Sequence, residues 1–328
     1  MTSWPLIIAH RGASGYFPEH SLAAYELAIA QGADALEPDV VSTADGVLVI
    51  RHENELSATT DVGTKVEFAS RHQTRVVSGE VVTGWFTEDF TWEELQTLAC
   101  VEPQPLMRKE SAKAPKQPLL RLSDLLGVID RADRPVSVVV ELKHPSHFDS
   151  LNLNLDEALA RELDLAGWRR NDKRVIVESF EVTILRRCRE AGIGYHHIYL
   201  IDEEGTAPDQ RALLGDMALT YAQQRRMESL RSLGKSLDGI SVSVRLFDTD
   251  EGVDLVGLCH DLGLKVFVWT LRAENKYLPR QWREGFDLKA WGNWRPYFES
   301  IIATGVDGVF ADQPDLLVRL KNAVTDEP

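Results

Sequence analysis

The chain has 328 residues, of which 44% are hydrophobic and 27% are charged, and these values predict a globular protein with a large core. Its 51 acidic and 36 basic residues give a formal net charge of -15, which argues against binding to nucleic acid or to anionic membranes. The three cysteines, Cys100, Cys188 and Cys259, are far apart without metal-ligand spacing, so we expect reduced thiols.

The sequence shows no sign of export or of membrane insertion. Residues 1–5 contain no basic region followed by a long apolar core, and no apolar run reaches the roughly 20 residues that a membrane span needs. We therefore expect a cytoplasmic protein without stable membrane association. These features do not specify an oligomeric state.

Short apolar runs, typical of buried strands, alternate with longer amphipathic segments. The expected strands are Leu6–Ala9, Ala33–Asp39, Val136–Lys143, Val175–Phe180, His197–Ile201, Gly239–Val244, Lys265–Leu271 and Gly308–Asp312. The expected helices are Ser21–Gln31, Asn154–Ala166, Val182–Ala191, Tyr221–Leu233, Val253–Leu262 and Pro296–Ala303. Eight strands that alternate with helices predict an α/β fold, a TIM (β/α)8 barrel. The alternative is a doubly wound open sheet, but no Gly-x-Gly-x-x-Gly fingerprint follows any strand.

Two connections between the expected elements are long. Residues 56–118 include an irregular stretch over 109–118, and we expect them to form a small insertion subdomain after the second strand. Residues 1–55 and 119–328 would then form the catalytic barrel. The second long connection, 272–295, carries five aromatic residues that either pack this loop onto the barrel or line a substrate mouth: Tyr277, Trp282, Phe286, Trp291 and Trp294.

Polar residues cluster at the ends of the first apolar runs. His10 and Arg11 follow the first run, Glu37 and Asp39 end the second, and His52 follows a third. Because side chains alternate along a strand, Glu37 and Asp39 point the same way. At ~5 Å and an effective dielectric near 20, two such carboxylates repel by roughly 3 kcal/mol, and a divalent cation is the usual compensating charge. The pattern suggests a metal-assisted acid–base site.

Glu141 and Lys143 extend this pattern on a later strand. They share one strand face, while Val138, Val140 and Leu142 occupy the other. An all-carboxylate ligand set selects a hard cation over zinc or copper. Histidine suits proton transfer near neutral pH, and Arg and Lys suit an anionic substrate.

Seven segments, taken in order, closely resemble the glycerophosphodiester phosphodiesterase family. They are Ile8–Ser21, Gln31–Asp39, Thr43–His52, Glu141–Lys143, Glu178–Phe180, Trp269–Thr270 and Gly305–Asp312. The resemblance spans nearly the whole barrel and is weakest over residues 56–118. It implies a TIM barrel with an insertion after the second strand, a bound Mg²⁺ or Ca²⁺, and hydrolysis of glycerophosphodiesters to glycerol 3-phosphate and an alcohol.

The same resemblance assigns roles to individual residues. The metal ligands would be Glu37, Asp39 and Glu141, the acid–base pair would be His10 and His52, and the phosphate-binding residues would be Arg11 and Lys143. Phe180 would form a pocket wall, and Trp269 would line a glycerol site. Glu19 is either a surface carboxylate or a residue near the site that holds Arg11 or supports the metal ligands.

Two features of the remaining residues qualify this assignment. Glu53 follows His52 where the family more often has Asp, which puts the supporting role of that position in doubt. The other seven histidines are expected to be structural: His20, His72, His144, His147, His196, His197 and His260.

Two other functions stay open at this stage. A phospholipase D-like lyase would use the substrate's own free hydroxyl as the nucleophile and release a cyclic phosphate. A catalytically inactive barrel that only binds phosphodiesters would need a missing site residue, and none is missing. The partner would in each case be a small phosphodiester and not nucleic acid. The headgroup of that substrate is not specified by the sequence.

Overall fold

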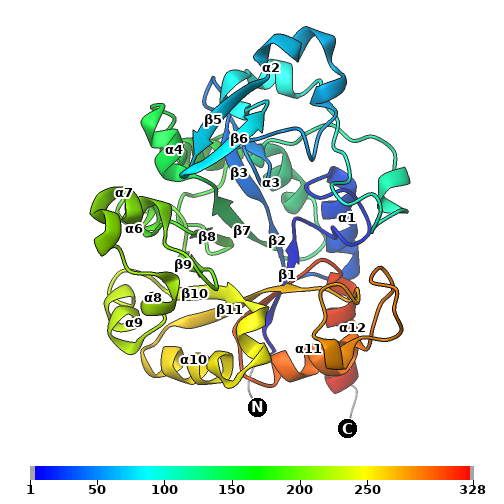
Figure 1. The fold of residues 1–328 in the computed structure, drawn as a ribbon, viewed down its shortest axis with the longest axis vertical. Coiled ribbons are helices and arrows are strands. Elements are labelled where there is room, and N and C mark those ends of the chain that lie inside the picture. The colour runs from blue at the N-terminus through cyan, green and yellow to red at the C-terminus, as the bar shows by residue number, and fades with distance from the viewer. Residues whose placement is uncertain (1–3, 326–328) are drawn as a thin grey trace.

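The computed structural model describes residues 4–325 and shows a closed barrel of parallel strands surrounded by helices (Figure 1). The barrel strands are β1 (Leu6–His10), β2 (Ala35–Glu37), β3 (Asp39–Ser42), β7 (Ser137–Leu142), β8 (Val175–Ser179), β9 (His196–Ile201), β10 (Gly239–Ser243), β11 (Lys265–Leu271) and β12 (Gly308–Ala311). Their order is β2-β1-β12-β11-β10-β9-β8-β7, and a pairing of β2 with β7 closes the ring. The predicted TIM barrel is confirmed, and the doubly wound open sheet is wrong.

The second barrel strand is interrupted at Pro38. A single strand over 33–39 was expected, but β2 and β3 are separate because proline has no N–H to donate to the ladder. β2 pairs with β1 and β7, whereas β3 pairs with β7 in parallel and with β4 (Leu48–Ile50) in antiparallel. The Pro38 carbonyl still accepts the N–H of Glu141 at 3.0 Å. Counted as one interrupted strand, β2 and β3 bring the barrel to eight strands.

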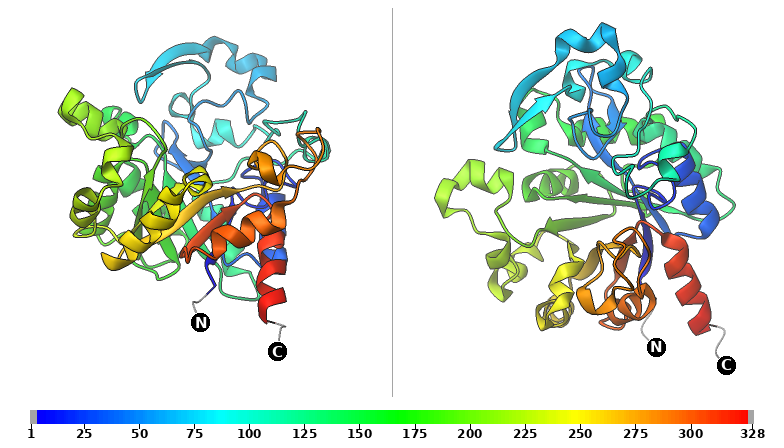
Figure 2. Two further views of the ribbon diagram at one scale, coloured as in Figure 1. Left: turned by 60° about the horizontal axis from the view of Figure 1, so that its bottom comes forward. Right: turned by 45° about the vertical axis from the view of Figure 1, so that its right-hand side comes forward.

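Helices lie between the strands and around the barrel (Figure 2). They are α1 (Leu22–Gln31), α2 (Trp92–Leu95), α3 (Leu122–Asp130), α4 (Pro145–Ser150), α5 (Leu155–Leu165), α6 (Val182–Glu190), α7 (Pro208–Leu214), α8 (Tyr221–Gln224), α9 (Met227–Leu233), α10 (Asp250–Asp261), α11 (Trp294–Ile302) and α12 (Pro314–Thr325). The first follows its sequence signals, since the Ser21 hydroxyl accepts the N–H of Ala24 and Gly32 ends the helix at a φ of 93°. None of the helices of residues 4–325 is long and apolar enough to cross a membrane.

One helical prediction is wrong, and five helices were not predicted. The segment expected as one helix over 221–233 is two, α8 and α9, because Arg226 is extended at a ψ of 151°. There the Arg225 guanidinium reaches Glu251 and the carbonyl of Asp202, contacts that hydrophobic periodicity does not encode. The short helices α2, α4 and α7 and the longer helices α3 and α12 were not expected at all.

The inserted segment, residues 56–118, lies at one end of the molecule beyond the barrel (Figures 1 and 2). It contains a hairpin of β5 (Gln73–Val77) and β6 (Glu80–Gly84), together with α2 and short 3-10 turns. The ring centroids of its Phe68 and Phe90 are 5.0 Å apart, and both residues belong to the hydrophobic cluster that includes barrel residues. Its description as a separate subdomain therefore stays a prediction.

An apolar layer fills the interior of the barrel. It consists of one side chain from each of seven strands: Ile8, Ala35, Val139, Ile176, Ile198, Phe267 and Phe310. All seven are at most 5% exposed. A packed layer of this kind makes the barrel interior a floor and not a pore.

Candidate active site

The candidate site stands directly on this apolar floor. Since side chains alternate along a strand, the residue two positions further along each strand faces the same interior, one layer closer to the carboxyl ends. That next layer is His10, Glu37, Glu141, Glu178, Leu200, Trp269 and Asp312. A cavity of about 140 Å³ lies at this level and is lined by six of these seven residues, together with Arg11, His52, Lys143, Phe180, Thr270, Arg272 and Phe310. The strand pattern therefore changes from apolar to ionisable within two residues, at the rim where TIM barrels carry their sites.

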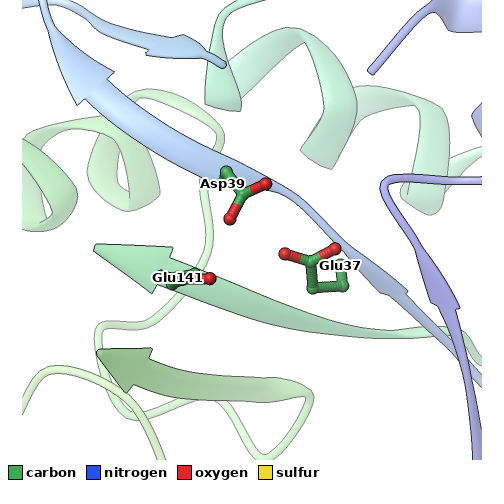
Figure 3. A group of neighbouring side chains, drawn as sticks. All are labelled: Glu37, Asp39 and Glu141. Carbon is green, nitrogen blue, oxygen red and sulfur yellow. The ribbon is translucent and has the colours of Figure 1, made fainter. Parts of the chain in front are cut away.

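Three carboxylates converge from neighbouring strands (Figure 3). Glu37 ends β2, Asp39 begins β3, and Glu141 lies on β7 in register with Asp39. One oxygen of each lies within 4.8 Å of the others, and all three residues are buried. The Oδ1 atom of Asp39 is buried without a hydrogen-bond partner. A buried carboxylate oxygen without a donor fits a cation ligand, and this all-oxygen set fits Mg²⁺ or Ca²⁺.

The charges of the cluster cannot all be accommodated by the protein alone. Burial and the neighbouring Asp39 raise the pKa of Glu37 well above its ordinary value. Burial raises the pKa of Glu141 to about 8, with Lys143 opposing and Asp39 adding to the shift. Burial also acts against ionised Asp39, but His52, Lys143 and Arg11 hold its pKa well below the ordinary value. A divalent cation would favour the ionised form of all three carboxyls.

Arg11 is held against the carboxylates by an unusual backbone conformation. Its φ is 57°, and its backbone N–H donates to Oε2 of Glu37 at 2.7 Å. Its guanidinium places Nη1 2.9 Å from Oε2 of Glu19 and Nε 3.2 Å from Oδ2 of Asp39. At Gly12, where φ is 81°, an added Cβ atom would come within 2.8 Å of the Ala24 backbone, so this turn requires glycine. Glu19 thus lies beside the site and holds Arg11.

His10 is fixed by a buried carboxylate. Its Nδ1 lies 2.7 Å from Oδ1 of Asp312, while the other Asp312 oxygen accepts Nε of Arg272 at 2.7 Å and Nη2 of Arg108 at 2.5 Å. Burial opposes the charge of Asp312, but Arg272, Arg108 and His10 hold its pKa well below the ordinary value. Burial and the adjacent Arg11 lower the pKa of His10 to about 4. The neutral ring therefore donates its Nδ1–H to Asp312 and keeps a lone pair on Nε2.

His52 has a similar arrangement at the other side of the cavity. Its Nδ1 lies 2.9 Å from Oε1 of Glu53, and its Nε2 lies 3.3 Å from Nζ of Lys143. Lys143 in turn lies 2.9 Å from Oε1 of Glu141. The second Glu53 oxygen lies 2.9 Å from Nε2 of His144. Burial, Arg11 and Lys143 lower the pKa of His52. Glu53 thus contacts both His52 and His144.

Two aromatic rings form part of the wall of the same cavity. The Phe180 and Trp269 ring centroids are 5.9 Å apart, and both residues line the cavity. Nζ of Lys143 lies 5.6 Å from the Phe180 centroid. On its other side Phe180 contacts Tyr221, at 6.3 Å between ring centroids. All ten residues named from the sequence are therefore brought to one end of the barrel.

Sequence reasoning missed four residues that support this site. Asp312 and Arg272 follow the last two barrel strands, so their positions at strand ends were a usable signal. Arg108 comes from the inserted segment, and no local pattern marked it. His20 was expected to be merely structural, but its Nε2 lies 2.9 Å from Oδ2 of Asp39 while its Nδ1 contacts the Tyr25 hydroxyl.

Comparisons with known proteins agree with this arrangement. The model of the "Glycerophosphoryl diester phosphodiesterase family" matches residues 10–316. Glycerophosphodiester phosphodiesterase GDPD6 of Arabidopsis thaliana is 30% identical over 332 residues, covering 95% of this chain and 84% of the relative. A solved structure from Silicibacter pomeroyi DSS-3 aligns with a TM-score of 0.69 at 23% identity, covering 99% of this chain and 95% of that one. An Oleispira antarctica phosphodiesterase, solved in complex with the product sn-glycerol-3-phosphate, aligns with a TM-score of 0.62 at 21% identity, covering 98% of both chains.

Proposed function

The chain belongs to the glycerophosphoryl diester phosphodiesterase family, and from that membership we propose that it hydrolyses water-soluble glycerophosphodiesters to glycerol 3-phosphate and an alcohol in the cytoplasm. Three features support the proposal. Two carboxylates of the cluster, Glu37 and Glu141, share one cavity with two histidines and two basic side chains. The Oleispira antarctica relative holds glycerol 3-phosphate as a product. The cavity is of a size for one phosphate group and not for a polymer.

Glu37, Asp39 and Glu141 are the residues that would hold a divalent cation, Mg²⁺ or Ca²⁺. The orphaned buried oxygen of Asp39 and the all-carboxylate donor set fit such a group. When bound, the cation supplies positive charge against the phosphate oxygens, on which negative charge accumulates in the transition state. Arg11 and Lys143 provide the remaining positive charge at fixed positions, since each is held by a carboxylate.

His10 and His52 form the acid–base pair of this proposal. One ring accepts a proton at Nε2 from the water that attacks phosphorus. The other must enter the step as imidazolium, a form that a bound phosphate anion favours, and it donates its Nε2 proton to the alkoxide oxygen as the bond from phosphorus to the alcohol breaks. Asp312 and Glu53 keep the Nδ1 atoms occupied, so that proton transfer takes place at Nε2 on each ring. Phe180 and Trp269 exclude water from one side of the substrate, and Trp269 lines the glycerol half.

The observation that carries the proposal is that both histidines line one cavity with Glu37 and Glu141, and that Asp39 lies within 4.8 Å of both glutamates. The test is a panel of soluble glycerophosphodiesters assayed for released glycerol 3-phosphate, with added Mg²⁺ or Ca²⁺ and with a chelator. Glu141→Gln should abolish turnover, whereas Glu157→Gln, an exposed carboxylate on α5, should not. A panel in which no glycerophosphodiester is cleaved under any metal condition would leave only a phosphodiester-binding role.

A further inference from the structure

A second cavity, of about 290 Å³, opens beside the catalytic one. The two cavities share Glu141, Lys143 and Phe180. We propose that this second cavity, the headgroup pocket, binds the alcohol half of the substrate and selects a positively charged alcohol that carries an amine or a quaternary ammonium group. The inference rests on the proposed function and names the substrate class for that same site.

The position of the headgroup pocket follows from the residues at its boundary. Phe180 contacts Trp269 on the side of the catalytic cavity and Tyr221 on the side of the headgroup pocket. Lys143, the basic residue at the same boundary, is where a phosphate group would be held. The phosphate of a diester carries two substituents, the glycerol and the alcohol. When the phosphate is bound at Lys143, the glycerol can occupy the catalytic cavity and the alcohol can occupy the headgroup pocket.

The wall of the headgroup pocket carries three carboxyl groups without a cationic partner among the described residues. It includes Glu181, Asp202 and Glu204, and none of these three forms an ion pair with a residue in the range 4–325. Glu181 is 3% exposed, and its carboxylate accepts only the N–H and hydroxyl of Ser146, each at 3.1 Å. Burial raises the pKa of Glu181 to about 7, as expected for a carboxyl without a cation beside it.

The basic groups in the same wall are already engaged. Lys143 lies 2.9 Å from Glu141, and His144 lies 2.9 Å from Glu53. A cationic headgroup would therefore meet Asp202 and Glu204 without an ion-pair partner in the described part of the chain, and Glu181 wherever it is ionised, while the ammonium of Lys143 is held by Glu141. An anionic headgroup would be repelled by the same carboxylates. The rings of Phe180 and Tyr221 add apolar walls with negative π faces, which favour an organic cation over a neutral polyol of similar size.

The test compares kcat/KM for glycerophosphoethanolamine and glycerophosphocholine with kcat/KM for the neutral-headgroup diester glycerophosphoglycerol. The wild-type protein with added metal should prefer the two cationic headgroups, and rising salt should weaken the preference. The double variant Asp202→Asn with Glu204→Gln should lower the preference by between about two- and tenfold, because both carboxylates are partly exposed. Its rate on glycerophosphoglycerol should not change.

A matched control removes the same charge elsewhere. Glu26→Gln with Glu190→Gln neutralises two exposed carboxylates on α1 and α6 and should leave the preference as it is. Equal kcat/KM for cationic and neutral headgroups in the wild type, or a preference that the pocket variant keeps, would overturn the inference and leave the proposed function standing. Failure to cleave any diester would instead contradict the proposed function, and calorimetric binding of glycerophosphocholine against glycerophosphoglycerol would then decide the pocket's selectivity.

Discussion

Replacing Asp312 by asparagine should show what the negative charge of this residue contributes, because the size of the side chain stays the same. Asp312 is 2% exposed and accepts hydrogen bonds from His10, Arg272 and Arg108. Asparagine has the same size but presents one NH₂ group, which cannot accept from any of these donors. The change leaves positive charge without its counterion. With the single amide oxygen on the side of the two arginines, the NH₂ group faces Nδ1 of His10 and no longer fixes the tautomer of that ring.

Both expected effects have a magnitude that the structure constrains. Breaking a buried ion pair by removing one partner costs roughly 3–5 kcal/mol, and we expect the low end, about 3 kcal/mol. The reason is that Arg108 keeps Glu274 at 3.1 Å and that Arg272 is 25% exposed. The rate should suffer more than the fold, because a histidine in the wrong tautomer cannot transfer protons at Nε2. We expect kcat to fall on the order of 100- to 10,000-fold.

The stability effect has a definite pH dependence. Asp312 has a folded-state pKa well below its ordinary value, so its charge stabilises the fold above the unfolded-state pKa of about 3.9. That contribution is lost as the pH falls through the unfolded value toward the folded one. The difference in unfolding free energy between wild type and Asp312→Asn should therefore be constant near neutral pH and should shrink below about pH 4.

Urea unfolding across this pH range and steady-state kinetics at neutral pH provide the assay. Asp307→Asn is the matched control, because Asp307 precedes β12 and contacts His260 and the N–H of Val266 at the opposite end of the barrel. The control should keep kcat. A near-normal kcat in Asp312→Asn, or an equal loss in the control, would refute the idea that Asp312 acts through His10.

Three further predictions address the metal, the histidines and the substrate. Chelation should abolish turnover, and added Mg²⁺ or Ca²⁺ should restore it. Metal at 100 times its dissociation constant should also raise the unfolding free energy by about 2.7 kcal/mol. Full activity in protein found metal-free by elemental analysis would contradict this prediction. His10→Ala and His52→Ala should each lower kcat on the order of 100- to 10,000-fold with an unchanged circular dichroism spectrum, and the double variant should lose far less than the product of the two; near-normal rates in either single variant would remove that residue from the mechanism. Soluble glycerophosphodiesters should have a higher kcat/KM than a diacyl phospholipid or a dinucleotide, since the chain has a net charge of -15 and confines its positive potential to the site. Equal kcat/KM values would show that the site also accepts larger phosphodiesters.

The barrel and its ionisable layer could be predicted because both follow local alternation. Glu141 and Lys143 share a strand face with Val139 below them, so the sequence itself shows where the interior turns polar. The break at Pro38 was visible as a proline within a strand, but its consequence was not. Whether a second strand, β3, forms after Pro38 depends on its partner β7, which pairs with the segments on both sides of the break.

The supporting residues could not be predicted because their contacts are remote in sequence. Asp312 lies 302 residues from His10, and Arg108 lies 204 residues from Asp312. No periodicity or motif spacing connects such pairs. The prediction for His20 was wrong for a different reason. This residue follows Glu19 in a loop, and only its backbone conformation, with a φ of 62°, turns its ring toward Asp39. A site's inward-facing residues are thus encoded locally, while the groups that orient them depend on the closed barrel.

The most direct measurement of the central claim is phosphorus NMR of the products formed from a soluble glycerophosphodiester by the metal-loaded protein in ¹⁸O-labelled water. Hydrolysis at phosphorus by a water molecule predicts glycerol 3-phosphate as the only phosphorus product throughout the time course, with one solvent-derived ¹⁸O atom. A cyclic phosphate as the end product, or glycerol 3-phosphate without the label, would contradict hydrolysis by direct water attack.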